Sequence, residues 1–461
     1  MDLKNKRVII IGFAKTGRSL TRFLLRHQAA VMVNDIKVRE QFNEDLSALE
    51  REGVTFVLGR HPHDISRQAD LILISPGVDP NLAALTEARK QRVPIISEIE
   101  LACRFIDVPI IAVTGTNGKT TTTSLIADML RRSGFSVFMG GNIGIPLITF
   151  VYDRLQADYV VAELSSFQLE TIDAFRPHVA VLLNITQDHL DRYATFGDYC
   201  AAKFRIFMNQ RADDFAVINS DDARCSGVIA KLAAQTVPFS GVPFKGEGVH
   251  IAADFFYFQQ KDGSRHVYSQ SNVKLVGPHN RENLAAAIGA AELCGGSPDA
   301  IQESLDQFQG LEHRLEFVRE IGGVGYYNDS KATNIDALLK SLQSFPGNVI
   351  LIAGGREKGG EYDILKDIIR RKTRMLILLG EAQNKFYRLF SALTDTRFAR
   401  DMNNAVEIAL QHARGGDVVL LSPGCASFDM FSDYEERGRV FKESVRRAAA
   451  RKEFGEAVSH E

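Results

Sequence analysis

"AVTGTNGKTTTTSL", residues 112–125, follows a short apolar run and leads into a helical pattern of apolar residues. A strand, a glycine turn and a helix in this order can bind phosphate, because backbone N–H groups converge on its oxygens at a positively polarised helix start. The common pattern has another glycine where this chain has Val113. The stretch therefore predicts a shortened phosphate loop, with a strand-to-helix turn that binds no ligand as the alternative.

The predicted loop has the groups that a nucleoside triphosphate and its metal ion require. A lysine at the helix start reaches the β- and γ-phosphates, and the hydroxyl group after it holds Mg²⁺. Here these residues are Lys119 and Thr120. The predicted ATP-binding residues of the loop are Gly115, Thr116, Asn117, Gly118, Lys119, Thr120 and Thr121.

Short apolar runs without polar alternation recur along the chain, each followed by turn residues and a helical pattern. They read RVIIIGF, AVMVND, LILISPG, PIIAVTGT, YVVAELSS, VAVLLNIT, NVILIAGG, RMLILLG and DVVLLSPG. Such runs are typical of parallel strands covered on both faces. We predict an α/β fold of three domains, each a mainly parallel sheet with flanking helices: Rossmann-like at the N-terminus, P-loop in the centre and Rossmann-like at the C-terminus. The predicted boundaries are 1–97, 98–310 and 311–461, with a hairpin-like stretch at 321–330.

Composition excludes several classes of function. Lys and Arg number 55 against 57 Asp and Glu, so a net charge of -2 does not draw the chain to nucleic acid or to an anionic membrane. The five cysteines are scattered, which argues against a zinc site or a disulfide framework. No apolar run approaches the roughly 20 residues that a membrane span needs. We therefore expect a soluble protein of the reducing cytoplasm.

Nine further blocks narrow the interpretation. They are GGNIGIPL (140–147), ELSSFQLE (163–170), NITQDHLDRY (184–193), AAKFRIF (201–207), GPHNRENLAAA (277–287), GLEHRLEFV (310–318), YNDSKATN (327–334), GGREKGG (354–360) and LLSPGCASFDMFSDYEERG (420–438). With GTNGKTTT they resemble the Mur ligase superfamily, which includes folylpolyglutamate synthase, and within it the branch that adds D-glutamate. The Asp-Asn-Pro-Arg motif of the diaminopimelate- or lysine-adding branch is absent. The alanine-adding branch usually has His at the position of Asn117.

The resemblance implies a reaction. ATP would activate the carboxyl group of UDP-N-acetylmuramoyl-L-alanine as an acyl phosphate, and D-glutamate would attack it to form an amide. It also implies two Mg²⁺ ions, a monomer, and a place in cytoplasmic peptidoglycan precursor synthesis, and so in cell shape and cell division. Alternatives from other classes are a P-loop ATPase that acts on a macromolecular partner and an NAD-binding dehydrogenase.

The family assigns metal ligands and catalytic groups to specific positions. Glu163 ends a predicted strand and would bind Mg²⁺ with His189, while Lys203 would carry a carbamate that binds the second ion. The residues alone leave alternatives open: a helix N-terminal charge, a capping or core histidine and a lysine on an amphipathic helix. The implied metal ligands are Thr120, Glu163, His189 and Lys203, and the implied catalytic residues are Lys119, His189, Lys203 and Arg314.

The other implied contacts come from all three segments. The first segment has a glycine turn after a strand, but Ala14 replaces the glycine that lets a dinucleotide approach closely, which weakens the NAD alternative. The resemblance assigns this segment to the UDP group of the substrate. The implied ATP contacts outside the loop are Asn283, His313, Arg314 and Asp329; for His313 and Arg314 the alternative is a surface ion pair. The implied substrate contacts are Thr16, Gly17, Asp35, Lys37, Ser75, Asn142, Lys331, Thr333, Lys358, Ser427, Phe428 and Tyr434.

Overall fold

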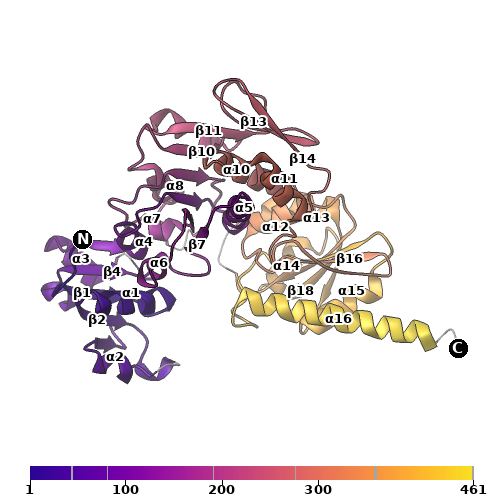
Figure 1. Ribbon diagram of the computed structural model, residues 1–461. Coiled ribbons are helices and arrows are strands. Elements are labelled where there is room, and N and C mark those ends of the chain that lie inside the picture. The colour runs from indigo at the N-terminus through magenta and orange to yellow at the C-terminus, as the bar shows by residue number, and fades with distance from the viewer. Residues whose placement is uncertain (43–44, 80, 190–191, 276, 358–360, 459–461) are drawn as a thin grey trace. The chain divides into compact units, whose positions relative to one another are not determined.

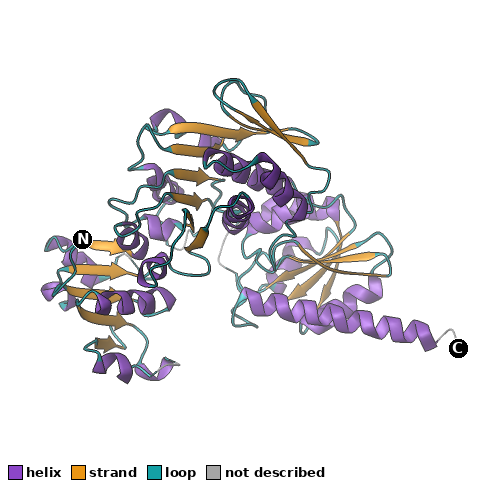
Figure 2. Ribbon diagram, viewed as in Figure 1, coloured by secondary structure: helices purple, strands orange, loops and turns teal. Residues whose placement is uncertain are grey.

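The computed structural model describes residues 1–461 apart from 43–44, 80, 190–191, 276, 358–360 and 459–461. It contains two compact units, of which the first comprises Met1–Ile185, Arg192–Ser271 and Glu282–Leu305. The second unit comprises Thr186–Asp191, Asn272–Arg281 and Asp306–Glu461. Two sheets lie in the first unit and one in the second, each with flanking helices (Figure 2). The α/β class predicted from the apolar runs is confirmed.

The first sheet is parallel throughout, with strands in the order β3-β2-β1-β4-β5. The strands are β1 (Arg7–Ile11), β2 (Ala30–Asp35), β3 (Thr55–Leu58), β4 (Leu71–Ile74) and β5 (Ile95–Ser97). The helices are α1 (Lys15–Arg26), α2 (Ser47–Arg51) and α3 (Ala83–Lys90), with 3-10 turns η1 (Arg39–Gln41) and η2 (Ile65–Gln68). Every residue of β4 is buried, as a sheet covered on both faces requires.

The central sheet has nine strands in the order β14-β13-β12-β11-β10-β9-β6-β8-β7. They are β6 (Ile110–Thr114), β7 (Val137–Gly141), β8 (Tyr159–Glu163), β9 (Val179–Leu182), β10 (Phe215–Asn219), β11 (Gln235–Ser240), β12 (Gly248–Ile251), β13 (Phe255–Gln259) and β14 (Arg265–Ser269). The helices are α4 (Glu98–Cys103), α5 (Lys119–Arg132), α6 (Leu147–Tyr152), α7 (Ser166–Leu169), α8 (Phe196–Phe204), α9 (Ala223–Ser226), α10 (Pro278–Leu293) and α11 (Pro298–Gln307), with η3 (Arg205–Phe207) and η4 (Ile229–Lys231). Because β6 lies between β8 and β9, the loops that follow these three strands emerge side by side.

The antiparallel end of the central sheet was not predicted. β12, β13 and β14 pair antiparallel, while β11 and β12 pair parallel. Along β13 the sequence FFYFQ alternates exposed or half-buried positions with buried ones. A strand with one covered face lacks the continuous apolar run on which the prediction depended.

The sheet of the second unit has the order β15-β16-β20-β17-β18-β19. Its strands are β15 (Glu316–Ile321), β16 (Val324–Asn328), β17 (Val349–Gly354), β18 (Thr373–Leu379), β19 (Asp395–Phe398) and β20 (Val418–Leu421). The helices are α12 (Ile335–Gln343), α13 (Lys366–Lys372), α14 (Gln383–Phe390), α15 (Met402–His412) and α16 (Tyr434–Val458), with η5 (Tyr362–Leu365). The predicted hairpin is confirmed as the antiparallel pair β15 and β16. Figure 1 shows α16, in yellow, which packs against α15.

Helix α4 follows β5 and carries two buried glutamates that bind backbone of the central part. Glu98 Oε1 accepts the N–H of Ile148 at 2.6 Å, in the first turn of α6. Glu100 accepts the N–H groups of residues 173–175 at 2.9 to 3.1 Å, and Arg104 donates to it at 2.8 Å. A buried carboxylate needs such donors, so α4 is held firmly to the central sheet's helices.

The buried carboxyl group of Glu98 makes stability depend on pH. Burial raises the pKa of Glu98 from 4.5 to about 7. The folded state therefore keeps this proton to a higher pH than the unfolded chain, and the free energy of unfolding falls as the pH rises through that window. We expect Glu98→Gln, which has no charge to bury, to lose this slope, a difference of about 3 kcal/mol. Urea unfolding of both proteins at about pH 5 and about pH 8 measures this difference. If the free energy of unfolding changes equally with pH in both proteins, Glu98 is not the source of the pH dependence.

Candidate active site

The phosphate loop lies between β6 and α5. Val113 is a fully buried residue of β6, so the strand continues to the point where longer loops begin. Asn184, beyond the end of β9, holds the loop: its Oδ1 accepts the N–H of Asn117 at 2.9 Å and its Nδ2 donates to the Asn117 carbonyl at 3.1 Å. The Asn184 carbonyl also accepts the N–H of Thr116 at 2.9 Å. The neighbouring strand thus preshapes the shortened loop.

Gly118 is the tightest point of the loop. Its φ of +87° is in the left-handed region, which side chains other than glycine rarely adopt. A Cβ atom on Gly118 would stand 2.1 Å from Oδ1 of Asn283, whose side chain is buried. Asn283, predicted to contact adenine, therefore packs against the loop itself; the adenine contact stays a prediction.

We expect Gly118→Ala to raise the KM for ATP by roughly 10-fold or more, because the loop must shift away from Asn283 and adopt a strained backbone. Steady-state kinetics with varied ATP measures this change. Gly134→Ala is the matched control, since Gly134 follows the other end of α5 with φ +93° and a Cβ there would meet nothing within 4 Å. Equal effects of the two substitutions on the KM would contradict the role of the Asn283 contact.

Two lysines converge on one carbonyl oxygen of the loop. Lys119 Nζ donates to the Gly115 carbonyl at 3.0 Å and to the Thr116 carbonyl at 2.8 Å. Lys203 Nζ, from α8, donates to the same Gly115 oxygen at 2.8 Å and lies 4.7 Å from the centre of the Tyr199 ring. Lys203 is only 2% exposed. Two ammonium groups at one turn favour a polyanionic ligand there.

Glu163, the last residue of β8, has an open coordination position. Its Oε1 accepts Nδ2 of Asn142 at 2.8 Å, and the Asn142 N–H donates to the Glu163 carbonyl at 2.8 Å. Its Oε2 is buried and has no hydrogen-bond partner in the described part of the chain. Such an oxygen is costly unless something binds it, and Mg²⁺ prefers oxygen ligands, so the residue fits a magnesium ion. No three His, Cys, Asp or Glu side chains form a metal-binding group among the described residues.

The glycine turn of the first sheet is organised by Asp35. Its Oδ2 accepts the N–H of Phe13 at 2.6 Å and its Oδ1 accepts the N–H of Lys37 at 2.9 Å. Gly17 is required here, since a Cβ would stand 2.2 Å from the Gly12 carbonyl oxygen, to which the Ser75 hydroxyl also donates at 2.9 Å. The structure thus brings the five predicted contacts of the first segment to one edge of this sheet; Thr16 is half-buried and Lys37 exposed. Their binding of UDP stays a prediction.

In the second unit, His313 is a buried residue rather than half of a surface ion pair. It has φ +65°, its Nδ1 lies 2.8 Å from Nδ2 of Asn328, and its N–H donates to Glu316 at 2.9 Å. Burial lowers the pKa of His313, which favours the neutral ring. Lys442 pairs with Glu312 at 2.8 Å and with Glu316 at 2.7 Å.

Asp329 follows β16 and is surrounded by donors. Leu315 N–H donates to its Oδ1 at 3.1 Å, and the hydroxyl groups of Ser341 and Ser422 donate to its Oδ2. Burial raises the pKa of Asp329 to about 6, with the donors opposing the rise. Arg314 is near enough to lower this pKa slightly. The predicted ribose contact is therefore a structural centre of this edge of the sheet as well.

The structure also describes most of the other predicted site residues of the second unit. Lys331 Nζ lies 3.7 Å from the centre of the Tyr434 ring, so two predicted glutamate contacts meet. Ser427 is buried and Phe428 is 62% exposed, while Thr333 is half-buried. His189 belongs to this unit, with φ +55° and its Nε2 3.7 Å from Asp188, and its joint binding of a cation with Glu163 stays a prediction. Lys358 lies outside the described residues.

Three family models match consecutive parts of the chain: the Mur ligase MurD-like N-terminal domain at residues 6–97, the Mur ligase middle domain at 113–291 and the Mur ligase glutamate ligase domain at 313–425. A curated protein of Geotalea daltonii, named UDP-N-acetylmuramoylalanine--D-glutamate ligase, is 45% identical over 97% of this chain and 99% of its own length. The chain belongs to the Mur ligase family.

This Mur ligase is also 46% identical to a protein of the same name from Geobacter sp. strain M21, over 97% of this chain and 98% of that protein. Among solved structures, the MurF ligase of Thermotoga maritima in complex with ADP matches with a TM-score of 0.62 and 17% identity, over 97% of each chain. At that identity the likeness concerns the fold alone, and it agrees with the three α/β sheets described above.

Two functional residues of this Mur ligase were not predicted. Asn184 was part of a quoted block, but no sequence signal indicates that its amide faces the phosphate loop. Arg437, 2% exposed on α16, donates to the hydroxyl and carbonyl of Ser330 at 3.0 and 2.8 Å and to the Cys425 carbonyl at 3.2 Å. Burial lowers the pKa of Arg437 to about 10. Arg437 thus holds the segments that carry Lys331 and Ser427.

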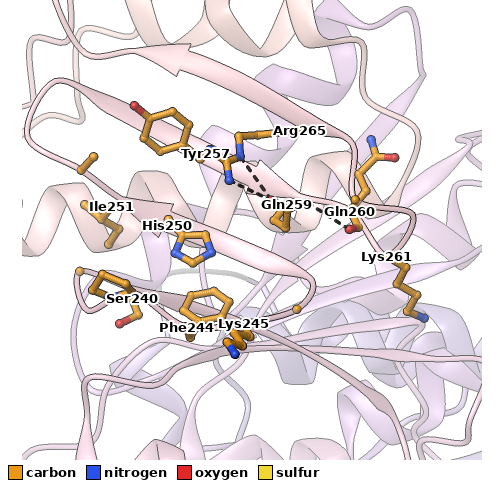
Figure 3. A pocket seen from close by; sticks show the side chains of 15 residues that line it. Ser240, Phe244, Lys245, His250, Ile251, Tyr257, Gln259, Gln260, Lys261 and Arg265 are labelled. Carbon is orange, nitrogen blue, oxygen red and sulfur yellow. Dashed lines mark hydrogen bonds between the residues drawn. The ribbon is translucent and has the colours of Figure 1, made fainter.

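A hollow of about 640 Å³ lies at the other end of the central sheet, between the loop after β11 and the strands β12 to β14 (Figure 3). Phe244 and His250 stack in it with ring centres 3.9 Å apart. Two of its cations have partners: Lys261 pairs with Glu247 at 3.7 Å, and Arg265 donates to Gln259 at 3.2 Å. The phosphate loop contributes no residue to this hollow.

Proposed function

We propose that this Mur ligase joins D-glutamate to the alanyl carboxyl group of UDP-N-acetylmuramoyl-L-alanine, with ATP cleaved to ADP and phosphate. The observation that carries the proposal is the near-full-length identity, 45 to 46%, to curated proteins named for this reaction. The phosphate loop with Lys119 and the open carboxylate oxygen of Glu163 support it chemically. We place the enzyme in cytoplasmic peptidoglycan precursor synthesis, as a monomer.

Each group at the loop has a defined task in this reaction. Lys119 and the N-terminus of α5 bind the triphosphate and orient its γ-phosphorus, while the substrate carboxylate attacks and ADP leaves. The glutamate amine then attacks the acyl carbon, loses a proton and expels phosphate. Arg314 would bind the transferring phosphoryl group. Glu163 and His189, together with Thr120, would hold one Mg²⁺ ion, and a Lys203 carbamate would help to hold the second; bound magnesium would neutralise phosphate charge.

Lys203 is proposed to carry the carbamate because its buried amine reaches the loop carbonyl itself. Loss of a proton from the ammonium, addition of CO₂ to the neutral amine and release of a second proton to solvent would convert the cation into an anionic carbamate, an oxygen ligand for a metal ion. Intact-protein mass spectrometry after preparation with bicarbonate tests this, with Lys203→Ala as the control that cannot carry the added mass. If the wild-type protein lacks the added mass, the carbamate proposal is contradicted but the proposed reaction is not.

One assay tests the reaction. ADP release is measured with UDP-N-acetylmuramoyl-L-alanine and D-glutamate together, with each omitted, with L-glutamate in place of D-glutamate, and with a folate plus L-glutamate. We expect release only with the first pair. Release that needs the folate would favour folylpolyglutamate synthase activity, and release without either acceptor would favour a simple ATPase.

We also keep the domain boundaries at residues 98 and 311 as a proposal. The buried contacts of Glu98 and Glu100 with α6 and with residues 173–175 support the first boundary, since α4 then packs with the central domain. The end of α11 at Gln307 and the start of β15 at Glu316 support the second.

A further inference from the structure

Arg192 joins two segments of the first unit that are far apart in sequence. Its Nη1 donates to the Pro76 carbonyl at 2.9 Å, and its Nη2 donates to Glu170 Oε2 at 3.1 Å. The guanidinium carbon lies 3.9 Å from the centre of the Phe167 ring. The side chain is 16% exposed, so these contacts are largely shielded from water. A planar, forked cation is the side chain that can stack and donate in two directions at once.

Each partner of Arg192 leads to a part of the proposed active site. Pro76 follows Ser75, whose hydroxyl donates to the Gly12 carbonyl in the glycine turn of the first sheet. Phe167 lies in α7 and Glu170 directly after it, and α7 begins three residues beyond Glu163 in the chain. The Arg192 side chain therefore spans from the proposed UDP site to the segment that follows the proposed magnesium ligand.

The next residue extends the connection to the phosphate loop. Tyr193 stacks on Phe167 with ring centres 5.9 Å apart and meets the Tyr199 ring edge-on at 5.3 Å. The Tyr199 hydroxyl lies 3.1 Å from Oγ1 of Thr116. A continuous series of packed groups thus runs from the turn at 75–77 to the loop at 115–118.

We propose that Arg192 is a positioning residue that sets the spacing between the nucleotide end of the acceptor substrate and its reacting carboxylate. This inference rests on the proposed function, since only a substrate that reaches from the first sheet to the phosphate loop experiences that spacing. Small misplacements of a bound substrate weaken catalysis strongly, so the effect is on turnover of the long substrate and not on ATP binding.

Two acceptors test the role: UDP-N-acetylmuramoyl-L-alanine and the shorter N-acetylmuramoyl-L-alanine 1-phosphate, which lacks the uridine end. For Arg192→Ala we expect kcat/KM to fall about 100-fold with the long acceptor and at most about threefold with the short one. The KM for ATP stays unchanged. Arg192→Lys keeps the charge but not the forked guanidinium group. Its kcat/KM with the long acceptor should lie between those of the wild type and Arg192→Ala.

Arg176→Ala is the matched control, because Arg176 also donates to two acceptors, Asp213 and Asp214, but at the opposite, amino-terminal edge of the central sheet. Arg176→Ala should change kcat/KM by the same factor for both acceptors. The melting temperature of each variant shows whether its fold is retained. If each Arg192 variant lowers kcat/KM by the same factor for the long and the short acceptor, the positioning role is overturned. If the wild-type protein does not use the long acceptor at all, the proposed function fails and this inference fails with it; an active wild type with unaffected variants overturns Arg192 alone.

Discussion

Lys119→Ala is expected to abolish ATP-dependent amide formation, with kcat reduced by about 1,000-fold or more. Lys119 is the first residue of α5, and its Nζ already lies at the carbonyls of Gly115 and Thr116, 3.0 and 2.8 Å away. Without this cation, the negative charge on the transferring phosphoryl group loses a positively charged partner at the start of α5. ADP release in the presence of both substrates measures the loss.

The fold should survive this substitution, because the Lys119 ammonium donates to carbonyls of the loop and alanine is a good helix former. Lys245→Ala serves as the control, since Lys245 is an exposed lysine of the hollow between the β11 loop and β12 to β14. The control should keep full activity. Substantial turnover by Lys119→Ala at an unchanged melting temperature would refute the proposed use of the loop.

Glu163→Gln is expected to lower kcat by about 100-fold or more and to raise the Mg²⁺ concentration needed for half-maximal rate. The substitution keeps the side chain's size and its contact with Asn142, but it removes the negative charge at the buried Oε2 position. Initial rates over a magnesium titration separate the two effects.

Glu303→Gln is the control for the glutamate substitution. Glu303 lies on α11 with half of its side chain exposed and pairs at 2.7 Å with Arg132, at the opposite end of α5 from the phosphate loop. Its magnesium curve should match that of the wild type. A Glu163→Gln curve that also matches the wild type would show that the open carboxylate oxygen binds no catalytic ion.

Strands with continuous apolar runs were predictable because burial on both faces requires an apolar side chain at nearly every position. All nine predicted runs form parallel strands, and the hairpin before Asn328 is present as well. Strands β13 and β14 were missed because only alternate residues are covered. They pair antiparallel as successive hairpins, β13 on β12 and β14 on β13, at the end of the sheet where β12 joins β11 in parallel.

At the candidate site, sequence reasoning located the groups that bear charge, such as Lys119, Glu163 and Asp329. It missed the residues that hold them. Asn184 and Arg437 are ordinary polar residues until the strand order brings them against a glycine loop or a backbone carbonyl. The interpretation of Asn283 changed for the same reason, since its amide packs against Gly118.

The sequence alone determined the α/β class, the phosphate loop and the family, because these depend on residue types at fixed local spacing. The glycines and lysine of the phosphate loop, and the apolar runs of the strands, can each be recognised from a few neighbouring residues in the sequence. Only the tertiary structure decided how the shortened loop is supported, which oxygen of Glu163 is open, and that Arg192 reaches Pro76. Those facts follow from contacts between segments up to about a hundred residues apart, and such contacts exist only after the sheet order is set.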